Sequence, residues 1–408
     1  MSTHSVLVAR QPIYDARVKV VGYEVLYRST AVNSSTFKNG DAATASVSVN
    51  ALLDIGLDTL VGPLPAFINC TRNILVQHMY EFLPAERVVL EVLEDIDPDE
   101  EVLAALTRAR AKGYGIALDD FVLSERNAPF VAHADVLKVD IPRLNGDEIE
   151  RHVQRLARPG LALLAEKVES HESFERCKKA GYGLFQGYFF ERPQLMRGRR
   201  APGDRMLLLR ILARVQDPEV DLEEIERLVS ANVSVTYKLL RYVNSAVVGA
   251  AEKIESIRHA IAMLGLERVR VCVVMLVLAT FDDKPHELIL TALVRARYCE
   301  LLATAQRRER AQAYFTAGLL SVLDAFMDRP MDELVRELSI SPELEAALLR
   351  REGPMGATLE IAVACERADW PRVQASGIDV EALRTAYLDA LSWAGRTDSA
   401  LSGAVRTH

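Results

Sequence analysis

Two adjacent carboxylates, Asp119 and Asp120, end the short apolar run Ile116-Ala117-Leu118 in the segment GIALDDF. Neighbouring carboxylates repel each other, and burying either one is costly unless it is paired with a cation or bound to a metal. Taken alone, an Asp after a strand is most often a turn or helix N-cap residue. A chemical role therefore depends on whether other polar residues reach the same place.

Several other predicted strands in the first half of the chain also end on a polar side chain. These strands are short apolar or β-branched runs, and stretches with helical periodicity separate most of them. The polar residues at their ends are Glu24, Asn69, Glu91, Asp119, Asp120, Lys138, Asp140, Glu166 and Gln186. Any one of them alone could be a surface, turn or capping residue. Their shared position at the strand ends is what favours a site.

The elements that position these residues form a regular β–α alternation, which predicts crossover helices and a parallel sheet. About eight strands within the first half of the chain fit a closed βα barrel better than an open sheet. The first two runs lie close together around Asp15 and suggest a hairpin, which departs from a regular barrel. In such a barrel the carboxyl ends of the strands meet at one mouth, where these folds keep their sites.

So many carboxylates in one mouth require a counter-charge. Hard divalent cations such as Mg²⁺ or Mn²⁺ suit a ligand set made of Asp, Glu and Asn oxygens. Two such cations close together suit hydrolysis of a phosphodiester, because they activate water and stabilise the developing charge, while a lysine can orient or deprotonate the nucleophile. We therefore expect a site for two metal ions at the mouth.

The second half of the chain reads as consecutive amphipathic helices, so the predicted fold class is α/β plus all-α. The predicted organisation is a (β/α) barrel domain at 1–195, a linker at 196–204, a helical domain at 205–395 and a flexible tail at 396–408. Asp221 with Glu224 predicts a capping box, and Gly265 and Gly395 predict helix C-caps.

Composition excludes some classes of partner. The net charge of −8 argues against bulk attraction to duplex nucleic acid or to an anionic membrane. The longest apolar run, at 271–279, is too short to span a bilayer, and the N-terminus lacks a secretory signal pattern. Five scattered cysteines without a CxxC pair predict reduced thiols in a cytoplasmic protein.

The ordered motifs of the first 195 residues resemble those of the EAL domain, the family of cyclic di-GMP phosphodiesterases. The matching motifs are Gln11-Pro12-Ile13, Glu24-Val25-Leu26 with Arg28, Asn69, Glu91, Asp119-Asp120-Phe121, Lys138-Val139-Asp140, Ala165-Glu166-Lys167-Val168-Glu169 and Gln186-Gly187-Tyr188. The resemblance implies the metal ligands Glu24, Asn69, Glu91, Asp119 and Asp120. It also implies a catalytic lysine, Lys138, a further metal or water contact, Glu166, and dinucleotide-binding residues Gln11, Arg28 and Gln186.

The chain departs from this family pattern at three places. Asp120 and Phe121 lead into VLSERNAPF instead of a Gly- and Ser-rich loop, Lys167 replaces a glycine, and Ser29 stands where Trp is usual. A lysine near the mouth would pair with a carboxylate or occupy part of the anion site. The metal ligands are thus retained on an altered scaffold. Hydrolysis of cyclic di-GMP, binding without turnover and a pure protein-interaction scaffold all stay open, with the scaffold least favoured.

The helical half resembles an HDOD domain, a relative of the HD-type metal phosphohydrolases. The matching text includes YKLLRYVNSAVVG and IESIRHAIAMLGLERVR. An HD hydrolase needs a His-Asp pair, whereas His259 and His286 are not followed by Asp. We therefore expect this domain to lack a metal site and to act as a regulatory module through a protein partner. A homodimer is compatible with the resemblance.

Overall fold

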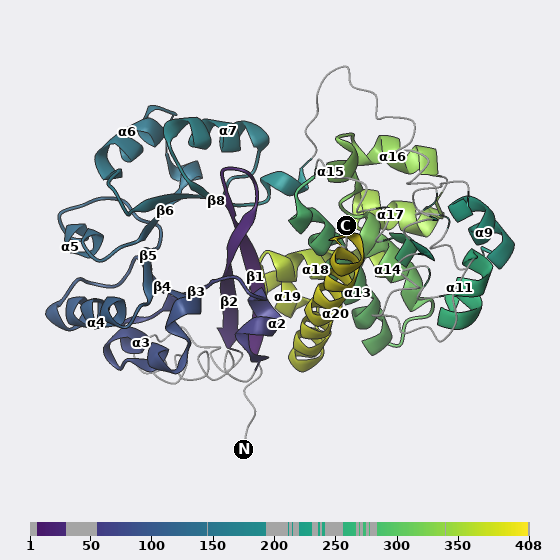
Figure 1. Cartoon of the computed structure of the whole chain (residues 1–408), viewed down its shortest axis with the longest axis horizontal. Helices are drawn as coiled ribbons and strands as arrows, with labels where there is room; N and C mark the ends of the chain where they lie inside the picture. The colour runs from purple at the N-terminus through teal and green to yellow at the C-terminus, as the bar shows by residue number, and fades with distance from the viewer. Residues whose placement is uncertain are drawn as a thin grey trace. The chain divides into compact units, whose positions relative to one another are not determined.

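The computed structural model describes residues 6–29, 55–144, 146–192, 220–230, 256–266, 284–338 and 340–406, together with isolated positions between 211 and 277. It divides into two compact units (Figure 1). One unit contains residues 1–192 with 364–388, and the other contains 193–363 with 389–408. The segment 364–388, within the predicted helical domain, is thus part of the barrel unit. The predicted linker at 196–204 lies outside the described residues.

Eight strands form a closed barrel, as the sequence predicts. They are β1 (Val6–Asp15), β2 (Val20–Ser29), β3 (Ala66–Cys70), β4 (Val88–Val92), β5 (Gly115–Leu118), β6 (Val136–Asp140), β7 (Ala162–Glu166) and β8 (Leu184–Gln186). The predicted hairpin is confirmed, because β1 runs antiparallel to both β2 and β8 while the other neighbours are parallel. Asp15 closes the hairpin by accepting the backbone N–H groups of Arg17 and Lys19 at 2.8 and 2.9 Å.

Helices connect the parallel strands of the barrel. They are α2 (Leu57–Val61), α3 (Arg72–Val76), α4 (Glu100–Ala111), α5 (Ala128–Val131), α6 (Gly146–Leu156) and α7 (His171–Ala180). Side-chain oxygens of Thr71, Asp99 and Ser170 accept a backbone N–H in the first turn of α3, α4 and α7. These caps satisfy donors that the helices leave open, and so they fix where each crossover begins.

Helices alone make up the described part of the second unit. The described helices of the C-terminal half are α9 (Leu222–Ser230), α11 (Ile257–Leu264), α13 (His286–Ala305), α14 (Ala311–Leu320), α15 (Leu323–Met327), α16 (Met331–Leu338), α17 (Pro342–Arg350), α18 (Gly353–Glu366), α19 (Trp370–Ala375) and α20 (Val380–Arg406). Helices α13 and α14 approach closely at Gly318, where a Cβ atom would lie 2.5 Å from the carbonyl oxygen of Arg295. Glycine is therefore required at that crossing.

The predicted helix caps have mixed outcomes. Asp221 accepts the N–H of Glu224 at 2.7 Å, but the carboxylate of Glu224 pairs with Arg214, so only half of the capping box forms. Gly265 ends α11 with a φ of 82°, as predicted. Gly395 does not end a helix.

The residues predicted as a flexible tail, 396–408, are helical as far as Arg406, because α20 continues to that residue. The residues after Gly395 include no proline, and alanine and leucine among them favour helix. The hydroxyl of Thr397 donates to the carbonyl of Trp393 at 2.6 Å, one turn back along the helix. The helix contains two interior glycines, Gly395 and Gly403, each of which costs about 1 kcal/mol, and the flanking helix formers offset this cost.

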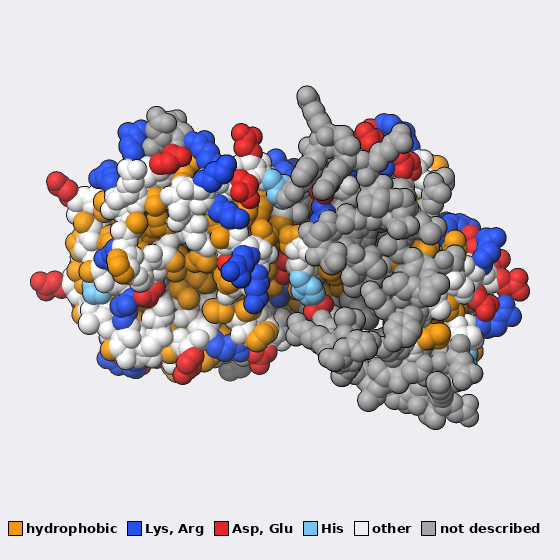
Figure 2. All heavy atoms as spheres, turned by 45° about the horizontal axis from the view of Figure 1, so that its top comes forward, with side chains coloured by type: hydrophobic (Ala, Val, Ile, Leu, Met, Phe, Trp, Pro, Cys, Tyr) orange, Lys and Arg blue, Asp and Glu red, His pale blue; other side chains and the backbone are white. Residues whose placement is uncertain are grey.

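The distribution of surface charge and the state of the cysteines follow the expectations drawn from the composition. On the face of the barrel seen in Figure 2, Lys and Arg side chains are interspersed with Asp and Glu. No helix in the described ranges is long and apolar enough to cross a membrane. The five cysteines, predicted to be reduced, are all free and buried: Cys70, Cys177, Cys272, Cys299 and Cys365.

Candidate functional site

Strand periodicity explains why the polar strand ends share one cavity. Side chains along a strand alternate between faces, so residues two apart point the same way. A buried apolar cluster at the barrel centre includes one residue from each of several strands, and the polar residue two positions further on is a member of the predicted site. These pairs are Phe67 with Asn69, Ala117 with Asp119, Val136 with Lys138, and Leu164 with Glu166. The apolar layer therefore lies directly beneath the layer of polar side chains at the mouth of the barrel.

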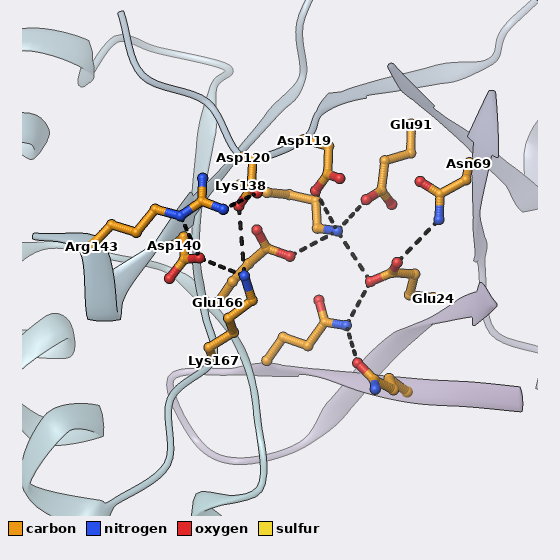
Figure 3. A network of polar contacts seen from close by, with 12 residues as sticks. Glu24, Asn69, Glu91, Asp119, Asp120, Lys138, Asp140, Arg143, Glu166 and Lys167 are labelled. Carbon is orange, nitrogen blue, oxygen red and sulfur yellow. Dashed lines mark hydrogen bonds and ion pairs between the residues drawn. The ribbon is translucent and has the colours of Figure 1, made fainter. Parts of the chain in front are cut away.

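The ammonium group of Lys138 lies among four carboxylates, and we call these five residues the Lys138 cluster (Figure 3). Its Nζ atom lies 3.1 Å from Glu24 Oε2, 3.1 Å from Asp119 Oδ1 and 2.9 Å from Glu166 Oε1, and it also contacts Glu91 Oε1. Lys138 is only 1% exposed and Glu91 is fully buried. One buried cation on β6 thus faces four acidic groups, each from a different strand or strand end.

The proton affinities in this cluster reflect burial and mutual charge. Burial, together with the neighbouring Glu24, raises the pKa of Glu91 well above its usual range. Burial also raises the pKa of Glu166 to about 7, although Lys138 opposes this shift. Burial alone would lower the pKa of Lys138, but the surrounding carboxylates outweigh it and the pKa is raised. Lys138 therefore carries its charge at neutral pH.

A chain of amide hydrogen bonds extends from the cluster. Gln186 Nε2 donates to Glu24 Oε2 at 2.7 Å and to Gln11 Oε1 at 3.1 Å. Gln11 Nε2 in turn donates to the hydroxyl of Tyr188 at 3.0 Å, and Asn69 Nδ2 donates to Glu24 Oε1 at 3.2 Å. The structure thus brings Gln11 and Gln186 together with the carboxylates.

Arg28 lies apart from this network. It is on the same face of β2 as Glu24 but four residues further along, about 13 Å at the usual rise of a strand. Among the described contacts none joins Arg28 to the Lys138 cluster or to the two glutamines. The structure therefore places Arg28 on the same side of the strand as the site without connecting it to the site.

Unsatisfied oxygen atoms point to a missing partner at the mouth. Among the described residues at the mouth, four buried acceptors have no hydrogen-bond partner: Asn69 Oδ1, Glu91 Oε2, Asp140 Oδ1 and Gln186 Oε1. Buried acceptors are normally paired, so each calls for an explanation. Oxygen atoms of this kind suit a hard divalent cation, and Asn69 and Glu91 belong to the predicted ligand set. The residues therefore fit such a group.

As the side chains stand, no three His, Cys, Asp or Glu residues in the described ranges are arranged to hold a metal ion. The reason lies in the Lys138 cluster, where the Nζ atom occupies the space between the carboxylates. Binding of a cation by Glu24, Glu91 and Asp119 would require Lys138 to withdraw from part of that space.

A second charged group adjoins the first, and we call it the Lys167 cluster (Figure 3). Lys167 Nζ lies 2.5 Å from Asp140 Oδ2 and 4.0 Å from Asp120 Oδ1. Arg143 Nη2 lies 3.0 Å from Asp120 Oδ2, and its Nε lies 3.1 Å from Asp140 Oδ2. The expectation that a lysine here would pair with a carboxylate is met. Arg143, which follows β6 in a short 3₁₀ turn, was not predicted as a site residue.

The altered loop after Asp120 is ordered by its own side chains. Asn127 Oδ1 accepts the N–H of Ser124 at 2.8 Å, and Asn127 Nδ2 donates to the carbonyl of Val122 at 2.7 Å. Arg126 Nε pairs with Asp97 at 2.6 Å, which ties the loop to the segment after β4. A pocket beside Asp119 and Asp120 is lined by residues of both segments. Asparagine and arginine thus replace the glycine-rich sequence expected of the family.

Tyr188 connects the site to the C-terminal segment of the same unit. Its hydroxyl donates to the carbonyl oxygen of Glu366 at 3.2 Å, and the guanidinium of Arg367 lies 4.8 Å from its ring centre. Gly187 before it has a φ of 145°, and a Cβ atom there would lie 2.1 Å from the carbonyl of Val168. Only glycine lets β8 end this close to the segment after β7. Sequence reasoning treated Gln186-Gly187-Tyr188 as a motif but had no signal for the contact with Glu366.

Both halves of the chain match known domain families. An EAL domain model matches residues 65–193 and an HDOD domain model matches residues 202–348. Cyclic di-GMP phosphodiesterase CdgJ of Vibrio cholerae is 34% identical over 400 residues, which cover 96% of this chain and 92% of that protein. An uncharacterised protein of Bacillus subtilis, YuxH, is 30% identical over 399 residues, covering 95% and 98%.

A solved structure of BlrP1 from Klebsiella pneumoniae, a complex with calcium and cyclic di-GMP, is 20% identical to this chain. The match covers 47% of this chain and 57% of that one, with a TM-score of 0.38. Family membership rests on the relatives that match along almost their whole length. The chain therefore belongs to the family of EAL–HDOD proteins, in which an EAL barrel is followed by a helical HDOD domain.

Proposed function

We propose that this chain is a cyclic di-GMP phosphodiesterase that acts in bacterial signalling in the cytoplasm. The observation that carries the proposal is the Lys138 cluster, in which four carboxylates share one ammonium while oxygen atoms of Asn69 and Glu91 lack partners. The name of the Vibrio cholerae relative supports the same activity. The product would be the linear dinucleotide pGpG, formed when water opens one phosphodiester of the ring.

Divalent cations, Mg²⁺ or Mn²⁺, would be held at the mouth by carboxylate and amide oxygens. The proposed ligands are Glu24, Asn69, Glu91, Asp119 and Asp120. Such cations activate water and stabilise charge that develops on the phosphodiester. Lys138 and Glu166 form a direct ion pair, with Nζ and Oε1 2.9 Å apart, and this pair would open so that both groups contact the attacking water. Because Lys138 is charged, it fits the role of an orienting cation better than that of a base.

The dinucleotide would be held by groups around this centre. Gln186 Oε1 has no partner and would accept an N–H or O–H of the ligand. Gln11 would share this contact through its bond to Gln186. Arg28 would pair with a phosphate from further along β2, since a guanidinium matches the geometry of phosphate oxygens.

The helical unit would act as a regulatory module through a protein partner. The two histidines that the sequence indicates are unsuited to a metal site lie on different helices: His286, on α13, pairs with Asp398 at 3.1 Å, and His259 lies on α11. The identity of the partner and a homodimeric state are further parts of the proposal, which interaction measurements on the full chain would test.

Turnover of cyclic di-GMP by the full chain tests the proposal. Purified protein would be incubated with cyclic di-GMP and Mn²⁺ or Mg²⁺, and pGpG would be followed by chromatography. We expect product from the parent and a loss of at least about 100-fold in Glu24→Ala, because the metals supply several kcal/mol of charge stabilisation. Equal turnover by parent and variant would contradict the proposed site.

A receptor that binds cyclic di-GMP without hydrolysis is the second candidate. The Lys167 cluster favours it, since two cations there already neutralise Asp120 and Asp140. Absence of product together with saturable binding of cyclic di-GMP would establish the receptor. Absence of both would leave a protein-interaction scaffold.

A further inference from the structure

The two charged clusters at the mouth differ in their balance of charge. The Lys138 cluster contains four carboxylates and one ammonium, so its formal charge is −3 when all groups are ionised. The Lys167 cluster contains two carboxylates and two cations, so its formal charge is zero. A divalent cation entering the mouth would therefore be drawn to the first cluster and would gain little at the second.

The backbone holds the second cluster in place. Lys167 has a φ of 54° and Asp120 a φ of 43°, both in the left-handed region that L-residues seldom adopt. Such conformations persist only where the surroundings enforce them, and they gather at functional sites. Lys167 is the residue after β7, and this backbone directs its ammonium to Asp140 at the end of β6. A glycine at 167 would adopt the same φ more easily but would bring no charge.

The contacts of Asp140 show where the side chains of Lys167 and Arg143 lie in the mouth. Asp140 is 7% exposed, and its Oδ2 atom receives both Lys167 and Arg143, while its Oδ1 atom has no partner. Asp120 likewise has Arg143 on one oxygen and Lys167 near the other. The ammonium of Lys167 thus lies where a cation shared by these two carboxylates would have to bind, 2.5 Å from Asp140 and 4.0 Å from Asp120.

We propose that Lys167, assisted by Arg143, takes the place of the second divalent cation, so that the mouth binds one metal ion and not two. This inference rests on the proposed function, because it assumes that the first ion binds at Glu24, Asn69, Glu91 and Asp119. Of the five ligands proposed above, four then hold the ion, and Asp120 serves instead as the ion-pair partner of Lys167 and Arg143. The ammonium of Lys167 supplies, without a metal, part of the positive charge that faces a bound phosphodiester.

The test counts Mn²⁺ ions bound to the full chain, by calorimetric titration and by the loss of the spectroscopic signal of free Mn²⁺. We expect one ion per chain in the parent and two in Lys167→Gly. Glycine relieves the left-handed strain, so this variant should fold at least as well as the parent. Lys167→Ala keeps the strain and removes the charge, and it should also bind two ions.

Two further variants locate the effect. Lys112→Ala removes a lysine that pairs with Glu81 away from the mouth, changes the net charge by the same amount, and should leave one ion. Lys167→Gly combined with Asp120→Asn should return the count to one, because the second ion loses a ligand.

Two ions in the parent would overturn the inference, and so would one ion in every variant. If the parent bound two ions and hydrolysed cyclic di-GMP, the inference would fail while the proposed function stood. If neither the parent nor the variants bound Mn²⁺, the inference and the metal site of the proposed function would fail together.

Discussion

Buried polar groups are organised differently in the two units. In the barrel unit, Lys138 contacts Glu24, 114 residues away, and Glu91, 47 residues away. In the helical unit, the hydroxyl of Thr316 donates to Gln312 and that of Thr358 to Pro354, each four residues back along its own helix. Buried hydroxyls of the helical unit are thus satisfied locally, whereas charges of the barrel meet only because the fold brings distant segments together.

This difference distinguishes buried polar groups that only stabilise the fold from buried polar groups that can bind a ligand. A helix satisfies a buried hydroxyl with its own carbonyl groups, and nothing is left for a ligand. The barrel mouth leaves oxygen atoms of Asn69 and Glu91 unpaired and places a formal excess of negative charge around Lys138. Burying a charge without a counter-charge costs free energy. Such an excess of buried charge is therefore expected at sites where a bound ligand supplies the missing counter-charge.

The largest expected effect comes from removing the buried cation of the barrel. Lys138→Met should destabilise the metal-free barrel unit by about 3–5 kcal/mol, because it leaves buried carboxylates without their ammonium. Thermal unfolding of the full chain would show the transition of the barrel lowered by roughly 10 °C, with that of the helical unit unchanged. A variant as stable as the parent would mean that the ammonium does not hold the mouth together.

An intermediate effect is expected from metal. Mn²⁺ at 100 times its dissociation constant should stabilise the barrel unit by about 2.7 kcal/mol, because the ion binds only the folded state. The melting temperature of the barrel should rise in the parent and should not rise in Glu24→Ala, which lacks a ligand. If Mn²⁺ instead raised the melting temperature of the helical unit, the metal site would lie in that unit and not in the barrel.

The smallest effect is expected from Arg295, a buried cation in the described part of the helical unit. Arg295→Met should cost about 1.5 kcal/mol, the usual contribution of a charged hydrogen bond, since Arg295 Nη1 donates to Ser321 Oγ at 3.0 Å. Ser321 keeps its own bond to the carbonyl of Gly318 at 2.7 Å. Chemical denaturation would measure the change. A loss as large as that of Lys138→Met would erase the distinction between the units.

Much of the barrel follows from the sequence because strand periodicity and strand ends are local signals. The hairpin around Asp15, the closed barrel and the meeting of Glu24, Glu91, Asp119 and Lys138 are all confirmed. Residues two apart on a strand share a face, so the pattern that places the core also places the site. Metal-binding roles for these residues stay predictions.

The missed features depend on contacts between segments that no local pattern marks. Arg143 reaches Asp120 from the turn after β6, and its type and spacing are those of an ordinary surface residue. The end of α20 was missed because Gly395 resembles a C-cap, whereas neighbouring helix formers decide the outcome. The grouping of 364–388 with the barrel was missed because an amphipathic helix does not reveal which surface it covers.

That grouping has a consequence for how the protein is made. The barrel unit includes residues up to 388, with Tyr387 buried and Tyr188 bonded to Glu366. Domains generally fold during synthesis in the order in which they leave the ribosome. Here the first 192 residues emerge early, yet their unit is complete only when almost the whole chain has been translated. The barrel unit can therefore reach its complete fold only after residue 388 has been translated, and most of the helical unit is synthesised before that point.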